Sequence, residues 1–164
     1  MLELKGVTKI FNIGTINENV VLHDINLNVN NGDFISIIGS NGAGKSTLLN
    51  VIAGVYPVDF GTIYLDGKNI TKLPEYERAK FIGRVFQDPM MGTAPSMAIE
   101  ENLSLAYCRD KTRKLRWGLN DELRKLFKEK LSELGLGLEN RMDIKVKLLS
   151  GGQRQALTLL IATM

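Results

Sequence analysis

The fold of this chain is decided by the stretch Gly39-Ser40-Asn41-Gly42-Ala43-Gly44-Lys45-Ser46-Thr47, which satisfies the pattern G-x-x-x-x-G-K-[ST] at every fixed position. Glycines let the backbone turn tightly, so that successive N–H groups point at one anion, and a following helix adds its positive end. The stretch therefore predicts a phosphate loop. In such a loop Lys45 reaches the β- and γ-phosphates and the Ser46 hydroxyl ligates Mg²⁺, and we expect Thr47 to support the α-phosphate side.

The residues on both sides of this loop have the pattern that a phosphate loop requires. The apolar run Phe34-Ile35-Ser36-Ile37-Ile38 before it predicts a strand that is covered on both faces. Residues 45–53 after it are helix formers, and Gly54 is a suitable stop.

The rest of the first half predicts further strands. Leu2, Leu4 and Val7 suggest one strand, and residues 25–29 alternate apolar residues with asparagines in a half-buried second one. Turns are expected at Asn31-Gly32 and, after residues 62–65, at Asp66-Gly67, both read as hairpin signals. Residues 82–86 predict another short strand. Strands alternating with helices indicate an α/β fold.

Beyond Gln87 the pattern becomes helical. Asn120 can cap a helix whose apolar residues fall at helical spacing up to Leu134, and Gly135 and Gly137 can end it. Leu149-Ser150-Gly151-Gly152-Gln153 opens a last helix, with Ser150 as the N-cap. Two glycines at such a helix start leave N–H groups uncovered, so this motif is a second surface suited to anions.

Composition excludes several classes of protein. The chain has 164 residues, 44% hydrophobic and 24% charged, which is typical of one soluble globular domain. No apolar run approaches a membrane span, and the first residues do not resemble a signal peptide, so we expect a cytoplasmic protein. A single cysteine, Cys108, and a single histidine, His23, make a zinc enzyme improbable.

The net charge of +3 is concentrated in one patch. Residues 109–116 hold five basic residues and one acid, a local charge of +4. Since +3 minus +4 is −1, the remaining chain is close to neutral. A solvated linker explains such a run more simply than a nucleic-acid footprint does.

The two glycine motifs together strongly resemble those of ABC ATPases, and Arg154-Gln155 continue the resemblance, which covers the chain from Leu2 to Met164. Gln87 matches the glutamine of the family's Q-loop, which contacts Mg²⁺ and the attacking water. Phe11 stands where the family keeps an aromatic residue that stacks on adenine.

The resemblance implies a P-loop core with an N-terminal antiparallel β subdomain and an α-helical subdomain. We expect residues 1–88 to hold the β subdomain and phosphate-loop core, and residues 89–164 the helical subdomain through the signature helix. ATP and Mg²⁺ are the implied cofactors. The implied ATP-contacting residues are Phe11, residues 39–47, Gln87 and residues 150–153, with Lys45 and Gln87 catalytic and Ser46 and Gln87 ligating Mg²⁺.

The resemblance also implies partners. Two such domains meet head to tail, each ATP lying between residues 39–47 of one and residues 150–153 of the other, so we expect an ATP-dependent homodimer or a pair with a similar chain. Residues 88–96 would receive a transmembrane permease. The same run, with Arg116-Trp117-Gly118, looks like ATPases of bacterial importers for amino-acid-like solutes, which work with a solute-binding receptor. The expected location is the cytoplasmic face of the membrane.

Hydrolysis in this family needs an aspartate, a glutamate and a histidine that follow the signature helix. The sequence reaches only Met164, so we expect an incomplete domain that does not turn over ATP, although the intact protein would. Asp66 and His23 precede the signature motif and do not replace these groups.

Three alternatives stay open. The first is an ABC-class ATPase that acts on nucleic acid, suggested by the basic patch beside Trp117. The second is another phosphate-loop enzyme, a kinase or GTPase, but neither explains residues 150–153, and the guanine-specificity sequence Asn-Lys-x-Asp is missing. The third is a regulatory module that binds nucleotide without transport.

Overall fold

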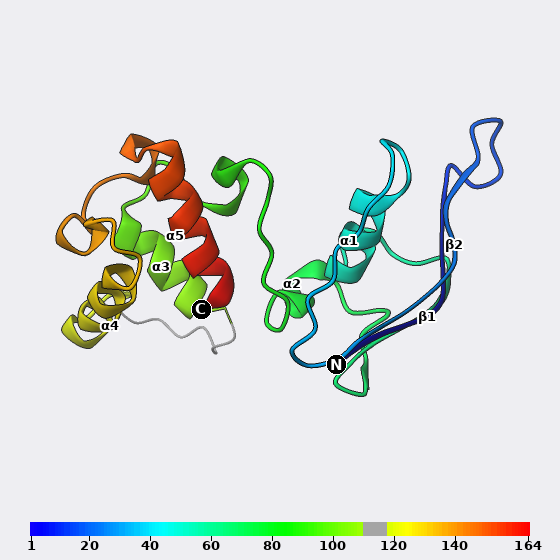
Figure 1. The fold of residues 1–164 in the computed structure, drawn as a ribbon, viewed down its shortest axis with the longest axis horizontal. Coiled ribbons are helices and arrows are strands. Elements are labelled where there is room, and N and C mark those ends of the chain that lie inside the picture. Colours follow the sequence, from blue (N-terminus) through cyan, green and yellow to red (C-terminus); the bar gives the residue numbers. More distant parts are fainter. Residues whose placement is uncertain (110–117) are drawn as a thin grey trace. The chain divides into compact units, whose positions relative to one another are not determined.

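The computed structural model describes residues 1–109 and 118–164. The chain forms two compact units, Met1–Ile82 and Gly83–Met164, and each is described by itself (Figure 1). The expected subdomains, residues 1–88 and 89–164, stay a prediction, because these units are defined by compactness and not by role.

An antiparallel sheet forms much of the first unit. Its strands are β1 (Leu2–Phe11), β2 (Asn19–Val29), β3 (Phe60–Leu65) and β4 (Lys68–Asn69), in the order β2-β1-β3-β4. The predicted hairpin at Asp66-Gly67 is confirmed, because it joins β3 to β4. Strands β1 and β3 approach closely at Gly61, where φ is +89° and a Cβ would lie 2.4 Å from the Gly6 carbonyl oxygen. Only glycine fits at this position.

Helix α1 (Lys45–Ala53) has the predicted bounds. Gly54 ends it in the left-handed conformation, as its place after the last apolar residue predicts. The short helix α2 (Glu75–Arg78) follows β4. The buried core of this unit joins the sheet to α1 and consists of Leu4, Val7, Leu22, Leu48, Val51, Ile63 and Ile70.

Two predicted strands are wrong. Residues 34–38 and 82–86 adopt no strand structure, and Phe34 and Ile38 are 95% and 92% exposed. A strand needs a neighbour to pair its backbone groups and cover its side chains, and the four-strand sheet includes neither segment. The Asn31-Gly32 turn forms, with the Asp33 N–H donating to the Asn30 carbonyl at 3.2 Å, but no second strand follows to complete a hairpin.

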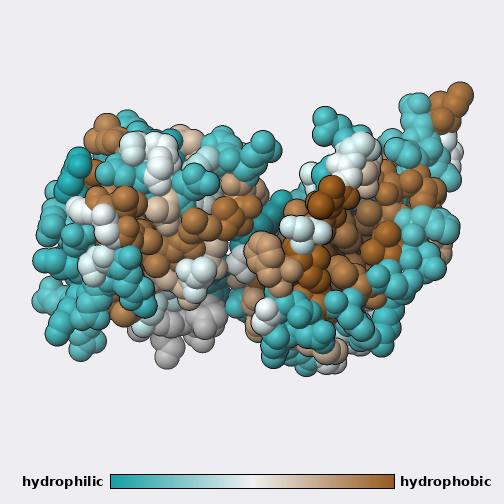
Figure 2. Space-filling model, viewed as in Figure 1, coloured by the Kyte–Doolittle hydropathy of each residue, from teal (hydrophilic) through white to brown (hydrophobic). Residues whose placement is uncertain are grey.

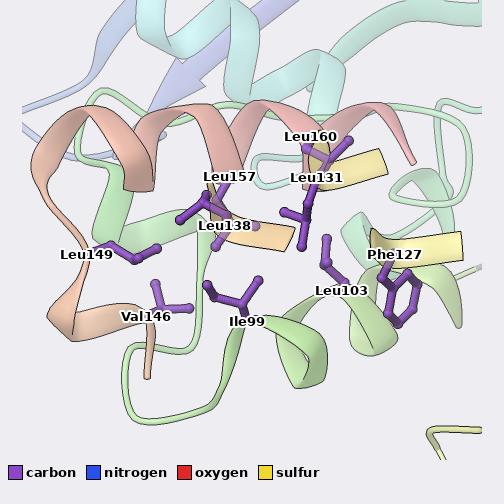
Figure 3. Packing of buried hydrophobic residues seen from close by; sticks show 9 residues of the cluster. All are labelled: Ile99, Leu103, Phe127, Leu131, Leu138, Val146, Leu149, Leu157 and Leu160. Atoms are coloured by element: carbon purple, nitrogen blue, oxygen red, sulfur yellow. The ribbon is translucent and has the colours of Figure 1, made fainter. Parts of the chain in front are cut away.

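The second unit is helical, as predicted. Its elements are η1 (Pro89–Gly92), α3 (Ile99–Tyr107), α4 (Asp121–Ser132), η2 (Leu138–Asn140), η3 (Val146–Leu148) and α5 (Gly151–Thr163). Asn120 caps α4, since its Oδ1 accepts from the Leu123 N–H at 2.8 Å. Nine side chains from these elements and from Leu149 point toward one another and form the core (Figure 3): Ile99, Leu103, Phe127, Leu131, Leu138, Val146, Leu149, Leu157 and Leu160.

Hydrophobic side chains also reach the surface of both units (Figure 2). Within residues 1–109 and 118–164, the helices are all too short or too polar to cross a membrane.

Candidate functional site: phosphate loop and signature helix

The loop before α1 has the backbone conformation that a phosphate loop requires. Gly42 and Gly44 have φ of +84° and +83°, and the Ala43 N–H donates to the Ser40 carbonyl at 3.2 Å. A Cβ on Gly44 would lie 2.9 Å from the Val21 carbonyl oxygen of β2. Glycine at position 44 is therefore required twice, by the left-handed backbone and by the close approach to β2.

Lys45 extends back over this loop. Its Nζ donates to the carbonyl oxygens of Gly39 at 2.8 Å and Ser40 at 2.7 Å. An ammonium group has three N–H donors, so one remains for an oxygen of a ligand. The side chain is thereby held over the residues that are expected to surround the phosphates.

The N-terminus of α1 is suited to an anion. Its N-cap is Gly44, no side chain caps it, and no acidic residue lies in its first turn. The first N–H groups of a helix have no intrahelical acceptor, and the helix dipole favours negative charge there. The exposed Ser46 hydroxyl adds an oxygen of the kind that Mg²⁺ prefers. These residues fit a polyphosphate with a bound Mg²⁺.

Phe11 ends β1 and is half-buried. Tyr56 meets it edge to face, with ring centroids 5.3 Å apart and an interplanar angle of 90°. The Lys9 ammonium lies 5.3 Å from the centroid of the Phe11 ring. Phe11 and the phosphate loop both belong to the unit Met1–Ile82.

The signature motif begins α5 as predicted. Ser150 and Gln153 form a reciprocal cap: Ser150 Oγ accepts from the Gln153 N–H at 3.3 Å, and Gln153 Oε1 accepts from the Ser150 N–H at 3.2 Å. Gly151 and Gly152 are exposed, and a Cβ on either would meet nothing within 4 Å. Packing among residues 1–109 and 118–164 therefore does not require glycine at these two positions.

Sequence reasoning missed the role of Arg154. Its guanidinium donates to the carbonyl oxygens of Val146, Lys147 and Leu149, at 3.4, 3.1 and 3.0 Å. These bonds hold the backbone that precedes Ser150. The one signal in the sequence was the basic residue directly after the motif.

Gln87 is exposed and lies in the unit Gly83–Met164, the unit that also carries residues 150–153. The next residue, Asp88, caps η1 by accepting from the Met90 N–H at 2.9 Å. Thr158 of α5 packs against the same turn, since a Cβ on Gly92 would lie 2.6 Å from its methyl group. The second unit therefore brings the segment that follows Gln87 into contact with the signature helix.

The basic patch falls mostly outside the described residues, which omit 110–117. Arg109, its first member, donates to the Ile161 carbonyl of α5 at 2.6 Å.

Known proteins match this chain over nearly its whole length. A family model described as ABC transporter matches residues 22–164. The chain is 43% identical to the tyrosine transport ATP-binding protein of Clostridioides difficile, over 100% of this chain and 65% of that protein. It is 34% identical to the spermidine/putrescine import ATP-binding protein PotA of Haemophilus influenzae, over 97% of this chain and 38% of that protein. The chain thus spans less than two thirds of the length of these relatives.

Solved structures agree. A dimeric ATP-binding cassette in a post-hydrolysis state, bound to ADP and Pi, has a TM-score of 0.79 at 32% identity and covers 99% of this chain and 68% of its own. A cassette in an ADP conformation has a TM-score of 0.76 at 32% identity, over 99% of this chain and 63% of its own. By sequence and by fold, the chain belongs to the ABC transporter family, as an ATP-binding domain of the α/β phosphate-loop class.

Proposed function

We propose that this chain is the nucleotide-binding part of the ATP-binding subunit of an ABC importer, which couples ATP binding and hydrolysis to solute transport. The observation that carries the proposal is the uncapped N-terminus of α1 with Lys45 held over the loop before it. Loop N–H groups and the Lys45 ammonium would bind the β- and γ-phosphates. The Ser46 hydroxyl would ligate Mg²⁺, and Gln87 would contact Mg²⁺ and the attacking water. An Mg²⁺ ion held by these residues would supply positive charge that offsets the negative charge on the phosphates during transfer.

Residues 150–153 would act on a second nucleotide. The cap uses the N–H groups of Ser150 and Gln153 but not those of Gly151 and Gly152, and these two glycines leave room for a phosphate to approach. A homodimer in which each signature motif closes the phosphate loop of its partner uses both features. The dimeric cassette of similar sequence supports this arrangement.

The names of the relatives support the import direction. Their names include tyrosine transport, spermidine/putrescine import and, for a protein of Streptococcus agalactiae that is 36% identical over 94% of this chain, ribose import. We propose that residues 88–96 bind a transmembrane permease at the cytoplasmic face of the membrane, and that a solute-binding receptor serves that permease. Tyrosine transport in the relative with the highest of these identities agrees with an amino-acid-like solute.

Residues 1–164 by themselves would bind nucleotide without sustained hydrolysis. Polarising the attacking water needs a carboxylate close to the γ-phosphate, and residues 144–164, which include the signature motif, contain no aspartate or glutamate. The complete protein is proposed to be an active ATPase.

Binding of a fluorescent ATP analogue to residues 1–164, displaced by unlabelled Mg-ATP, tests the nucleotide site. Lys45→Met should weaken binding at least tenfold, because it removes the one side-chain cation of the loop. Lys125→Met on the exposed face of α4 is the matched control and should bind like the unaltered chain. Equal affinity of both variants would contradict the proposed site. A phosphate-release assay on the same samples tests the expected lack of turnover.

A further inference from the structure

Lys9 is a buried lysine beside a residue of the proposed nucleotide site. It is 7% exposed, although lysine is almost never buried unless it is paired. Side chains two residues apart on a strand share a face, so Lys9 and Phe11 lie side by side on β1. No part of the proposed phosphate chemistry uses this lysine, and the phosphate loop already has its own cation in Lys45.

Asp59 fixes the position of the Lys9 ammonium. Lys9 Nζ lies 3.1 Å from Asp59 Oδ2 and 3.2 Å from Oδ1. The same carboxylate accepts from the Ile10 N–H at 2.6 Å, and the Asp59 N–H donates to the Thr8 carbonyl at 3.0 Å. The carboxylate is therefore fixed by the backbone of β1, and the ammonium is fixed by the carboxylate.

The Phe11 ring is held from two directions. The ammonium, 5.3 Å from the ring centroid, is within the range of about 6 Å for a cation–π interaction. Tyr56, in the segment after α1, contacts the ring edge to face. Phe11 itself is only half-buried, so part of it stays open to a ligand.

We infer that Lys9 is a positioning residue for nucleobase binding: paired with Asp59, it holds the Phe11 ring in the orientation that stacks on the base of ATP. This inference rests on the proposed binding of ATP and on the family resemblance, which implies that adenine stacks on Phe11. The inference predicts that Lys9 affects the binding only of ligands that carry a base, because it acts through the Phe11 ring. Phosphate binding at Lys45 does not depend on it.

The test uses residues 1–164 and two competitors of a fluorescent ATP analogue, Mg-ATP and Mg-tripolyphosphate. Lys9→Met should weaken ATP binding about threefold to tenfold, the range of a partly buried cation–π contact, and leave tripolyphosphate binding within about twofold. In a Phe11→Ala background, Lys9→Met should change neither the ATP affinity nor the tripolyphosphate affinity. Lys9→Arg, which keeps a cation beside Asp59, should retain ATP affinity. Circular dichroism and melting temperature establish that each variant is folded.

The outcomes separate the inference from its basis. Equal losses for ATP and tripolyphosphate in Lys9→Met would overturn the inference, because they indicate general damage. An unchanged ATP affinity in Lys9→Met would also overturn the inference if Phe11→Ala weakens ATP binding. If Phe11→Ala does not weaken ATP binding, Phe11 does not stack on the base, and the inference fails with that role. If neither Mg-ATP nor Mg-tripolyphosphate binds to the unaltered chain, the nucleotide site itself is refuted. If Lys9→Met does not fold, Asp59→Asn replaces it, because this variant leaves the ammonium without its carboxylate. Asp59→Asn should weaken the binding of ATP but not of tripolyphosphate, and equal losses for the two ligands would overturn the inference.

Discussion

The guanidinium of Arg78 donates to the Val51 carbonyl oxygen at 2.9 Å, across 27 residues of sequence. It also donates to the carbonyl oxygens of Ile52, Thr71 and Leu73, each at 2.9 Å. Arg78 is 1% exposed, and burial lowers its pKa from the ordinary value of arginine. One side chain thus satisfies the last turn of α1 and fixes the segment that leads into α2.

Replacing Arg78 by methionine should destabilise residues 1–164 by about 3 kcal/mol, because four buried or partly buried carbonyl oxygens lose their donor. The Arg78→Lys variant keeps the charge but lacks the planar fork of donors, so it should recover only part of this loss. Urea unfolding measures both. Arg124→Met is the matched control: it removes an exposed guanidinium paired with Glu100 and should leave the unfolding midpoint unchanged. Equal effects at positions 78 and 124 would contradict the role given to Arg78.

The contribution of Arg78 should not vary between pH 5 and 9. Its folded pKa is lowered, so the unfolded chain binds this proton more tightly and stability rises with pH only where the group titrates. That window is strongly alkaline, because arginine stays charged in proteins. The difference in unfolding free energy between the unaltered chain and Arg78→Met should therefore be the same at pH 5, 7 and 9. A difference that changes across this range would show that another group titrates with Arg78.

Gly44→Ala should cost more stability than Gly14→Ala. Both residues have left-handed φ, of +83° and +76°, so both variants carry the same backbone strain. Only at position 44 does the new Cβ meet a backbone atom, the Val21 carbonyl oxygen at 2.9 Å. We expect about 1 kcal/mol for Gly14→Ala and at least twice that for Gly44→Ala. Thermal unfolding of both variants measures the stability that each has lost. Equal losses of stability would mean that α1 moves away from β2 without cost.

Substitutions at residues 150 and 151 should differ in their effect on the stability of residues 1–164. Ser150→Ala removes the cap of α5 and should cost about 1 kcal/mol. Gly151→Ala meets open space and adds a better helix former, so it should be neutral or stabilise by up to about 1 kcal/mol. Chemical unfolding compares them. Clear destabilisation by Gly151→Ala would show that this glycine serves the fold of the chain itself.

Residues 34–38 should make residues 1–164 prone to self-association. Phe34 and Ile38 are almost fully exposed, and the segment has backbone groups that no strand of the described sheet pairs. Ile38→Lys should reduce light scattering at high protein concentration without lowering the melting temperature. Ile16→Lys, at the exposed tip of the β1–β2 hairpin, is the control and should reduce scattering less. Equal reductions would show that association depends on overall charge.

The sequence predicts well those features of the fold that depend on residues close to one another in the chain. The bounds of α1, the Asp66-Gly67 turn and the caps at Asn120 and Ser150 each depend on contacts within a few residues, and each is confirmed. Residues 34–38 have the composition of a buried strand, but strand structure depends on a neighbour that no local pattern supplies. The bonds of Arg78 reach carbonyls from 5 to 27 residues away, which no spacing rule indicates. The pairing of Lys9 with Asp59 spans 50 residues.

Helix α1 starts behind a glycine, with no side chain to accept its first N–H groups. A polyphosphate that binds there supplies the missing acceptor and becomes, for as long as it stays, part of the helix. Occupancy of the site and stability of the fold are then linked, because a ligand at a hundred times its Kd adds about 2.7 kcal/mol to the free energy of unfolding. A cell that runs low on nucleotide would expose this domain to its proteases sooner, so the abundance of the domain would follow the energy supply of the cell.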